Sequence, residues 1–200
     1  LFENTWVIFT SDHGEMLGDH HMSQKNLFFE GSAHVPLIIM PPQGRNLPHN
    51  FSVGELTDLV DIYPTILEMA GVACPIEASG VSLLHEIPKD RIFHGNSLNK
   101  NFCVMKDRKK LVYTAYGNQS LLFDLDKDPM ERHDLSDDES YRECKEELWN
   151  LLLAHTARYT PEALDENGRF LVSPAPRFPG YMPRRWFGFH YHDYNVDTFH

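Results

Sequence analysis

The sequence lacks the features of three common classes: membrane-spanning, nucleic-acid-binding and disulfide-rich proteins. No window approaches the roughly eighteen uninterrupted apolar residues of a membrane span. Lys and Arg number 18 against 29 Asp and Glu, so the net charge of -11 leaves no positive surplus for phosphate contacts. The three cysteines, Cys74, Cys103 and Cys144, are widely spaced and odd in number, which favours buried free thiols. We therefore expect neither a membrane span nor a nucleic-acid partner.

The first residues lack both an initiator methionine and a secretory signal pattern. Because the chain opens on Leu1, we expect further sequence upstream, and the compartment stays open. The length of 200 residues allows about one medium domain. Apolar residues make up 42% and charged residues 24%, which is ordinary for a globular protein.

Residues 1–90 have the pattern of the last part of an α/β domain. Thr5–Ser11 and Val35–Met40 are apolar runs that predict strands buried on both faces, as in a parallel sheet. Asp61–Ala70 predicts a helix that ends at Gly71. Its expected apolar face comprises Ile62, Tyr63, Ile66, Leu67 and Ala70. Two such strands and one helix cannot bury their own apolar surface, so upstream sequence or another chain has to cover them.

Residues 91–160 predict a small α+β subdomain, an antiparallel sheet plus a helix. Its four expected strands are Arg91–His94, Phe102–Lys106, Leu111–Thr114 and Leu121–Asp124. A helix from about Asp137 to Arg158 is expected to cover this sheet, with Ser136 and Glu139 as a capping box at its start. Its apolar positions are Tyr141, Cys144, Leu148, Leu151 and Leu152.

Residues 161–200 form a tail rich in proline, arginine and aromatic residues, for which we expect irregular structure. Its cationic, aromatic strip comprises Arg177, Arg184, Arg185, Trp186, Phe187, Phe189, His190, Tyr191, His192 and Tyr194. Such residues dominate interface hot spots, so the strip suits docking on a catalytic cleft or on a second copy as a homo-oligomer. Plain packing against upstream sequence explains it equally well.

Asp12 and His13 are the first candidates for a functional site. They follow the first predicted strand, and open α/β sheets place their ligands at the carboxyl ends of strands. A carboxylate and an imidazole can supply two ligands to a divalent ion, whereas Ca²⁺ takes about six or more. On the Asp-His-Gly letters alone, capping and local hydrogen bonding are the simpler reading.

Four wider motifs, in order over residues 1–150, carry a family resemblance. They read SDHGEMLGDHHMSQKNLFFEGSAHVPLII, DLVDIYPTILEMAGV, GVSLL and LLFDLDKDPMERHDL. Together they resemble the sulfatase (arylsulfatase-like) family of the alkaline-phosphatase-like superfamily, in its C-terminal portion. The resemblance implies that residues 1–90 end the α/β catalytic domain and residues 91–160 are the small subdomain. It also implies a hydrolase of sulfuric esters, with a sulfate ester of a small molecule or glycan as substrate.

Position by position, the resemblance makes Asp12 and His13 metal ligands and Lys25 the residue that contacts the substrate's sulfate. A lysine ammonium is a compact charge that can bind a tetrahedral oxyanion and offset charge developing on it. His20 lies in the family's Gly-Asp/Glu-His stretch and is a second candidate for catalysis. The metal implied is Ca²⁺, with Mg²⁺ or Mn²⁺ as alternatives.

Glu30 and His34 are expected to act on the loop rather than on the substrate. Glu30 is expected to fix the loop by bonding backbone amides. His34 stands where the family often has an arginine, which weakens the expectation of a loop-anchoring salt bridge there.

The family's nucleophile motif is absent from the sequence. That motif, Cys/Ser-x-Pro-x-Arg, becomes formylglycine, and residues 74–78 (CPIEA) match neither its spacing nor its arginine. The family's first pair of metal-binding carboxylates is also absent. We therefore expect the N-terminal part of the enzyme to supply a formylglycine, and this chain alone to be inactive.

Two alternatives to a sulfatase stay open on the sequence. A relative of the same superfamily that hydrolyses phosphate or phosphonate esters shares the metal ligands and a tetrahedral oxyanion substrate. A non-catalytic remnant chain would need none of Asp12, His13 and Lys25.

The alternating carboxylates Asp124, Asp126 and Asp128 suggest a calcium site. A turn that leaves a strand is the simpler explanation of this acidic motif.

Overall fold

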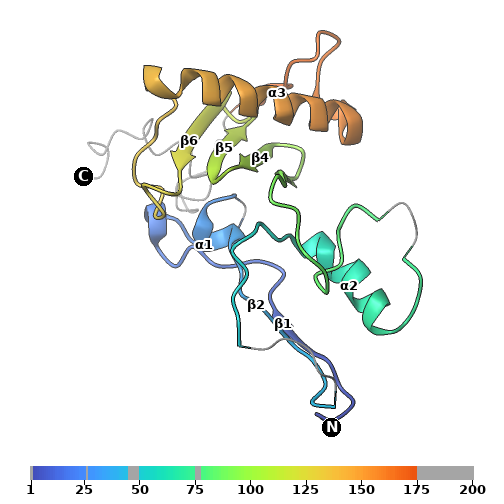
Figure 1. Cartoon of the computed structure of the whole chain (residues 1–200). Helices are drawn as coiled ribbons and strands as arrows, with labels where there is room; N and C mark the ends of the chain where they lie inside the picture. The colour runs from blue at the N-terminus through green and yellow to red at the C-terminus, as the bar shows by residue number, and fades with distance from the viewer. Residues whose placement is uncertain (1, 26, 45–49, 75–77, 175–200) are drawn as a thin grey trace. The chain divides into compact units, whose positions relative to one another are not determined.

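A computed structural model describes residues 2–25, 27–44, 50–74 and 78–174 (Figure 1). Their contacts divide the chain into two compact units. The first comprises the residues up to Asp12 together with Val35–Arg91. The second comprises His13–His34 together with the chain from Ile92 onward. The chain therefore leaves the first unit at Asp12 and returns to it at Val35.

In the first unit, strands β1 (Val7–Thr10) and β2 (Leu37–Met40) form a two-stranded antiparallel sheet. The strands were predicted, but the expectation of a parallel, doubly buried arrangement was wrong for this pair. Phe9 is 59% exposed and Ile38 60% exposed. An apolar run indicates that both faces of a strand suit burial, but it does not encode the direction of the neighbouring strand.

The predicted helix of the first unit is present as α2 (Ile62–Met69), preceded by the short η2 (Leu59–Asp61). Gly71 ends it with a φ of +69°, a backbone conformation that glycine adopts without strain. The predicted apolar face was wrong, because Tyr63 and Ile66 are exposed. The buried residues of α2 are Pro64 and Thr65, and Thr65 accepts a 2.9 Å hydrogen bond from the amide of Leu83.

A buried ion pair that the sequence did not predict joins α2 to the end of the unit. Arg91 donates from both terminal nitrogens to the carboxylate of Asp61, at 2.7 Å each. Asp61 is fully buried and also accepts from the amides of Asp58 and Val81, at 2.8 and 2.9 Å. The two ends of the segment from Asp58 to Arg91 are therefore fixed on one carboxylate.

In the second unit, four consecutive strands form an antiparallel sheet in the order β3-β4-β5-β6. They are β3 (Phe93–Ser97), β4 (Asn101–Lys106), β5 (Lys109–Thr114) and β6 (Gln119–Asp124). This confirms the predicted small antiparallel sheet, with the first strand displaced by two residues.

Helix α3 (Arg142–Tyr159), preceded by η3 (Glu139–Tyr141), packs on one face of this sheet, as predicted (Figure 1). Leu148 and Leu152 are buried among residues of the sheet, and Tyr141, Cys144 and Leu151 pack at the margin. The predicted capping box was wrong, because Asp138 caps the helical segment by accepting from the amide of Ser140 at 2.8 Å.

The opposite face of the sheet is covered by residues 13–34, which were expected to belong with the first strands. This segment contains η1 (Asp19–His21) and α1 (Glu30–Ala33). Its buried residues form a second core with residues of the sheet: Met16, Met22, Leu27 and Phe29 with Cys103, Val112, Phe123 and Leu125. The small sheet thus has α3 on one side and the segment with the candidate site residues on the other.

After α3 the chain continues through η4 (Pro161–Ala163) and a bridge between Leu164 and Phe170. Phe170 is buried against Tyr113, with ring centroids 4.4 Å apart. The Arg-rich, aromatic strip of the tail lies outside the described residues. No helix of the described part is long and apolar enough to cross a membrane.

Candidate functional site

The two ends of the 13–34 segment meet at a pair of glycines. The amide of Gly14 donates to the carbonyl of Ser32 at 2.8 Å, which ties the residue after His13 to α1. A Cβ at Gly14 would come well inside 3.0 Å of the carbonyl oxygen of Gly31. Only glycine therefore fits at position 14, and its contact with α1 fixes the backbone beside His13.

His13 and Lys25, which the sequence places twelve residues apart, meet in the structure. The ammonium nitrogen of Lys25 contacts Nε2 of His13 directly. Nδ1 of the same ring lies 2.7 Å from the carbonyl oxygen of Gly14. Because a carbonyl only accepts, this contact favours the tautomer with the proton on Nδ1. The lone pair of Nε2 is then directed at Lys25.

Glu15 holds the hairpin that brings Lys25 to His13. Its carboxylate accepts from the amide of Gln24, the residue before Lys25, and the amide of Met16 donates to the carbonyl of Gln24 at 3.1 Å. The amide of Gly18 donates to Met22 at 2.8 Å further along the hairpin. The position of Lys25 is therefore set by its own backbone neighbours.

The tip of this hairpin has an unusual backbone. Leu17, His20 and His21 have φ values of 49°, 50° and 57°, in the left-handed region that non-glycine residues rarely adopt. The ring of His20 stacks on Phe29, with centroids 4.2 Å apart and an interplanar angle of 20°. His20 therefore has a packing role, and its part in catalysis stays a prediction.

Asp12 is the residue at which the chain leaves the first unit, and its carboxylate lies 3.5 Å from the hydroxyl of Ser11. Together with His13 it offers one oxygen and one nitrogen ligand of the types that divalent ions accept. Within the described ranges, no group of three or more His, Cys, Asp or Glu side chains could hold a metal. Each side chain is of a type that a divalent ion accepts, and metal binding by Asp12 and His13 stays a prediction.

Glu30 fixes the segment, but the predicted bonds to backbone amides were wrong. Its carboxylate binds the buried ammonium of Lys110, and it also accepts from Nδ1 of His34 at 2.8 Å. Burial would raise the pKa of Glu30, but Lys110 and His34 together lower it below its ordinary value. His34 thus contacts the Glu30 carboxylate at the position where the family often has an arginine, and this contact is a salt bridge when the imidazole is protonated.

Lys110 and Glu131 are the residues that the sequence reading missed. Lys110 stands directly before the predicted strand Leu111–Thr114, and Glu131 ends the acidic stretch for which the sequence predicts a turn. The signal that could have identified Lys110 is the alternation of side chains along β5. Residues two apart in a strand share a face, so Lys110 lies on the same face as the buried Val112. No comparable periodicity marks Glu131.

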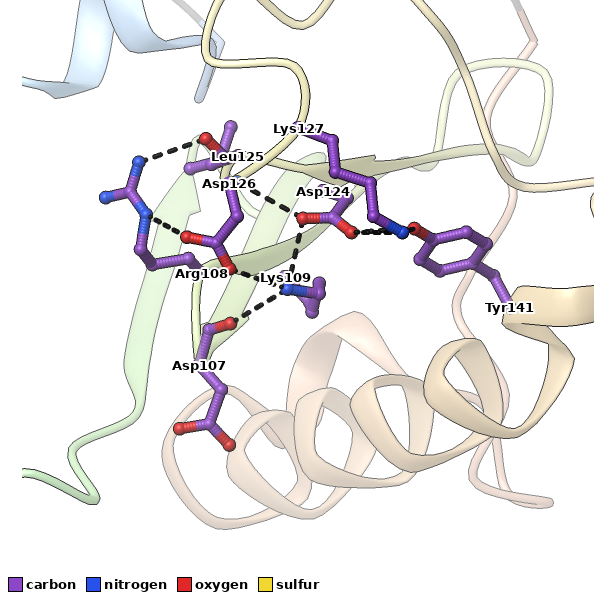
Figure 2. Close-up of polar contacts among 8 residues, drawn as sticks. All are labelled: Asp107, Arg108, Lys109, Asp124, Leu125, Asp126, Lys127 and Tyr141. Carbon is purple, nitrogen blue, oxygen red and sulfur yellow. Dashed lines mark hydrogen bonds and ion pairs between the residues drawn. The ribbon is translucent and has the colours of Figure 1, made fainter.

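The acidic motif after β6 is a turn held by cations, as Figure 2 shows. The amides of Lys127 and Asp128 donate to the carbonyl of Asp124 at 3.1 and 2.8 Å, which confirms the predicted turn. The carboxylate of Asp124 binds Lys109 at 3.0 Å and accepts from the hydroxyl of Tyr141 at 2.6 Å. Burial would raise the pKa of Asp124, but the bonds to Tyr141 and Lys109 lower it far below its usual range. This network joins the start of α3 to the sheet.

Comparison with known proteins places this arrangement in a class. The chain is 37% identical over 151 residues to arylsulfatase K of Rattus norvegicus, covering 66% of this chain and 26% of the relative. It is 33% identical over 159 residues to an arylsulfatase of Clostridium perfringens (strain 13 / Type A), covering 75% and 33%. The chain thus spans between a quarter and a third of these curated relatives.

Solved structures agree with this class. A 2-O GAG sulfatase matches with a TM-score of 0.64 at 27% identity, over 82% of this chain and 39% of that one. The phosphonate monoester hydrolase of Agrobacterium radiobacter matches with a TM-score of 0.60 at 30% identity, over 88% and 39%. The alkaline-phosphatase-like fold class predicted from the sequence is confirmed.

The fold and the order of the motifs define the C-terminal portion of a sulfatase-type protein. More particularly, residues 18–158 match the family described as N-sulphoglucosamine sulphohydrolase, C-terminal. The chain belongs to that family, and the resemblance seen in its motifs is confirmed.

Proposed function

We propose that the protein is a metal-dependent sulfuric ester hydrolase, to which this chain contributes Lys25 as the sulfate-binding residue and Asp12 and His13 as metal ligands. The observation that carries the proposal is the contact between Lys25 and His13 in a chain of the sulfatase type. An ammonium and a metal-ligating imidazole at one point suit a substrate group that bears negative charge on tetrahedral oxygens.

The residues of this chain would act by binding and orientation. Lys25 would donate to a sulfate oxygen and offset the charge that develops there as the ester bond breaks. The bond from Nδ1 of His13 to Gly14 would leave Nε2 without a proton, as a metal ligand requires, and Lys25 would give up its contact with Nε2 to the metal. A divalent metal, Ca²⁺ by the hard oxygen donor and the family, with Mg²⁺ or Mn²⁺ as alternatives, would polarise the sulfate oxygens. A formylglycine nucleophile is expected from sequence that these 200 residues do not contain.

The substrate would be a sulfate ester of a small molecule or a glycan. Curated relatives named arylsulfatase support an aryl sulfate as the first assay substrate. The neighbour described as a 2-O GAG sulfatase supports sulfated glycans as the second class.

A phosphonate ester hydrolase is the second candidate. The observation that favours it is the match to the phosphonate monoester hydrolase of Agrobacterium radiobacter, at 30% identity. Both reactions begin with a tetrahedral oxyanion beside a cation, so Lys25 and His13 suit either one.

The test uses the protein expressed from its complete gene, assayed with p-nitrophenyl sulfate and with p-nitrophenyl phenylphosphonate. A sulfatase would turn over the sulfate with the higher kcat/KM, and Lys25→Ala would lower that value by about 10²–10³-fold. Lys89→Ala, at an exposed lysine outside the 13–34 segment, is the matched control and should keep full activity.

Other outcomes would redirect the proposal. A higher kcat/KM on the phosphonate would favour the second candidate. Hydrolysis of neither ester by a folded, metal-supplemented protein would favour a non-catalytic remnant. Full activity of Lys25→Ala on the sulfate would remove Lys25 from the site.

A further inference from the structure

Lys110 is a cation buried in the core between the small sheet and the 13–34 segment. Its side chain is 3% exposed, and it lies on the face of the sheet that also carries Cys103 and Val112. Burying an ammonium among apolar side chains costs several kcal/mol unless it is paired and fully hydrogen-bonded. An apolar residue of similar length would fill the same space at lower cost, so the charge itself calls for an explanation.

The ammonium of Lys110 makes three hydrogen bonds. Two of the acceptors lie in the 13–34 segment, and the third is Glu131, which itself binds that segment. One N–H donates to the carbonyl oxygen of Phe28 at 3.0 Å, and a second binds the carboxylate of Glu30. The third donates to the carboxylate of Glu131 at 2.8 Å. Two of the three acceptors thus lie on the chain a few residues after Lys25.

Glu131 completes the network from the other side. Its second carboxylate oxygen accepts from the backbone amide of Glu30 at 2.7 Å, so one carboxylate holds both Lys110 and the first residue of α1. Glu131 is 2% exposed and has a φ of +54°, where a residue other than glycine is strained. A strained, buried charge persists only where the surrounding contacts require that residue.

The charges of the network support one another. Burial would lower the pKa of Lys110, but the carboxylates of Glu131 and Glu30 outweigh burial and leave that pKa above its ordinary value. Burial raises the pKa of Glu131, and the attraction of Lys110 offsets part of that rise. Lys110 therefore stays an ammonium at neutral pH.

From these contacts we propose that Lys110 and Glu131 are positioning residues, which hold the segment that carries Lys25 and His13 on the small sheet. The link to Lys25 runs through the Phe28 carbonyl, three residues later in the chain. The link to His13 runs through α1, whose Ser32 carbonyl accepts from the amide of Gly14. The kinetic part of this inference rests on the proposed function, whereas the structural part does not.

The first experiment compares Lys110→Met with Lys109→Met in the protein expressed from its complete gene. The two lysines are adjacent on β5, and their side chains point to opposite faces of the sheet. Lys109 binds Asp124 and Asp126, whereas the network of Lys110 lies on the other face of the sheet. The two variants therefore carry the same substitution on opposite faces of the sheet, and only Lys110→Met removes a contact with the 13–34 segment.

Two readouts separate positioning from general support of the fold. Hydrogen exchange of the amides of Gly14, Met16 and Gly18, all hydrogen-bonded within the site segment, should accelerate at least about tenfold in Lys110→Met and stay unchanged in Lys109→Met. Titrated per folded active site, kcat/KM for p-nitrophenyl sulfate should fall about 10²-fold with a raised KM, because displacement of a binding group by about 1 Å has that effect. A merely structural role would lower the folded fraction and leave KM unchanged.

A second variant covers the case in which Lys110→Met does not fold. Glu131→Gln keeps the length of the side chain and an oxygen for the amide of Glu30, but removes the charge that holds Lys110. It should fold and show the same two changes at smaller size, about tenfold in kcat/KM.

The outcomes distinguish this inference from the proposed function. Unchanged exchange and unchanged KM in both Lys110→Met and Glu131→Gln would overturn the positioning role, even in an active sulfatase. Faster exchange of the site segment in a protein that hydrolyses no ester would support the positioning role while removing the proposed function.

Discussion

Gly14 lies against Gly31 so closely that no side chain fits between them. This contact joins the backbone beside His13 to helix α1, and α1 in turn begins at Glu30, the partner of Lys110. A single glycine therefore connects the candidate metal ligand to the buried charges under the loop.

Gly14→Ala should destabilise the second unit by roughly 1–3 kcal/mol, because the added methyl group meets backbone that cannot rotate away. Chemical denaturation followed by hydrogen exchange of the Ser32-linked segment measures the effect. Gly54→Ala is the control, since a Cβ there has nothing within 4 Å. Equal stability of the two variants would show that the segment can shift to accept the methyl group.

The stability of the second unit should rise with pH between about pH 4 and 6.5. Burial, and then the nearby His155, lower the pKa of His94 from 6.5 to about 4. Its Nε2 is buried without a hydrogen-bond partner among the described residues, and its ring stacks on His155 at 3.9 Å. The folded state thus binds fewer protons than the unfolded state in that interval, so acidification favours unfolding.

The measurement is the denaturant midpoint at several pH values for the wild type and for His94→Phe. The phenyl ring keeps the stacking on His155 but cannot be protonated, so the pH dependence in this interval should become weaker. A variant with the slope of the wild type would assign the dependence to another group.

Arg91→Met should destabilise the first unit by about 3–5 kcal/mol, because it leaves the fully buried Asp61 without its cation. Arg142→Met is the matched control, since Arg142 pairs with Glu139 at the surface and should matter by less than about 1 kcal/mol. Denaturation monitored in each unit separately, by exchange of its own amides, gives both values. If Arg91→Met lowered the stability as little as Arg142→Met does, water would have to reach the carboxylate of Asp61.

Tyr141→Phe should cost about 1–2 kcal/mol, because it removes the donor to Asp124 at the junction between α3 and the sheet (Figure 2). Tyr159→Phe, at the exposed last residue of α3, should be neutral. The shift in thermal midpoint of the two variants provides the comparison. A neutral Tyr141→Phe would leave Lys109 and Lys127 as sufficient partners of Asp124.

Much of the secondary structure could be predicted because it depends on local periodicity. The apolar positions Leu148 and Leu152 recur at helical spacing, and turn residues separate the strands β3 to β6. The cap of α3 was misplaced at Ser136 instead of Asp138, because several residues that can cap a helix stand close together. Strand direction at β1 and β2 could not be read, since apolar content is the same for either direction.

The sequence could name candidate site residues, but it could not name the buried residues that hold their segment on the sheet. Motif resemblance pointed to His13 and Lys25, and the structure brings these two together. The cover of the sheet by residues 13–34 depends on contacts between distant parts of the chain, which no local pattern contains. Lys110 and Glu131 were missed for the same reason, because each looks like a surface charge until its distant partner is known.

The dependence of the small sheet on residues 13–34 has a consequence for folding during synthesis. Glu30 and Glu131 are 101 residues apart, so at about 5–20 residues per second Glu30 waits roughly 5–20 s for its partner to leave the ribosome. Until strands β4 to β6 have been synthesised, Met16, Met22, Leu27 and Phe29 have no sheet to pack against. The nascent chain therefore exposes these apolar side chains for seconds before the sheet that buries them has formed.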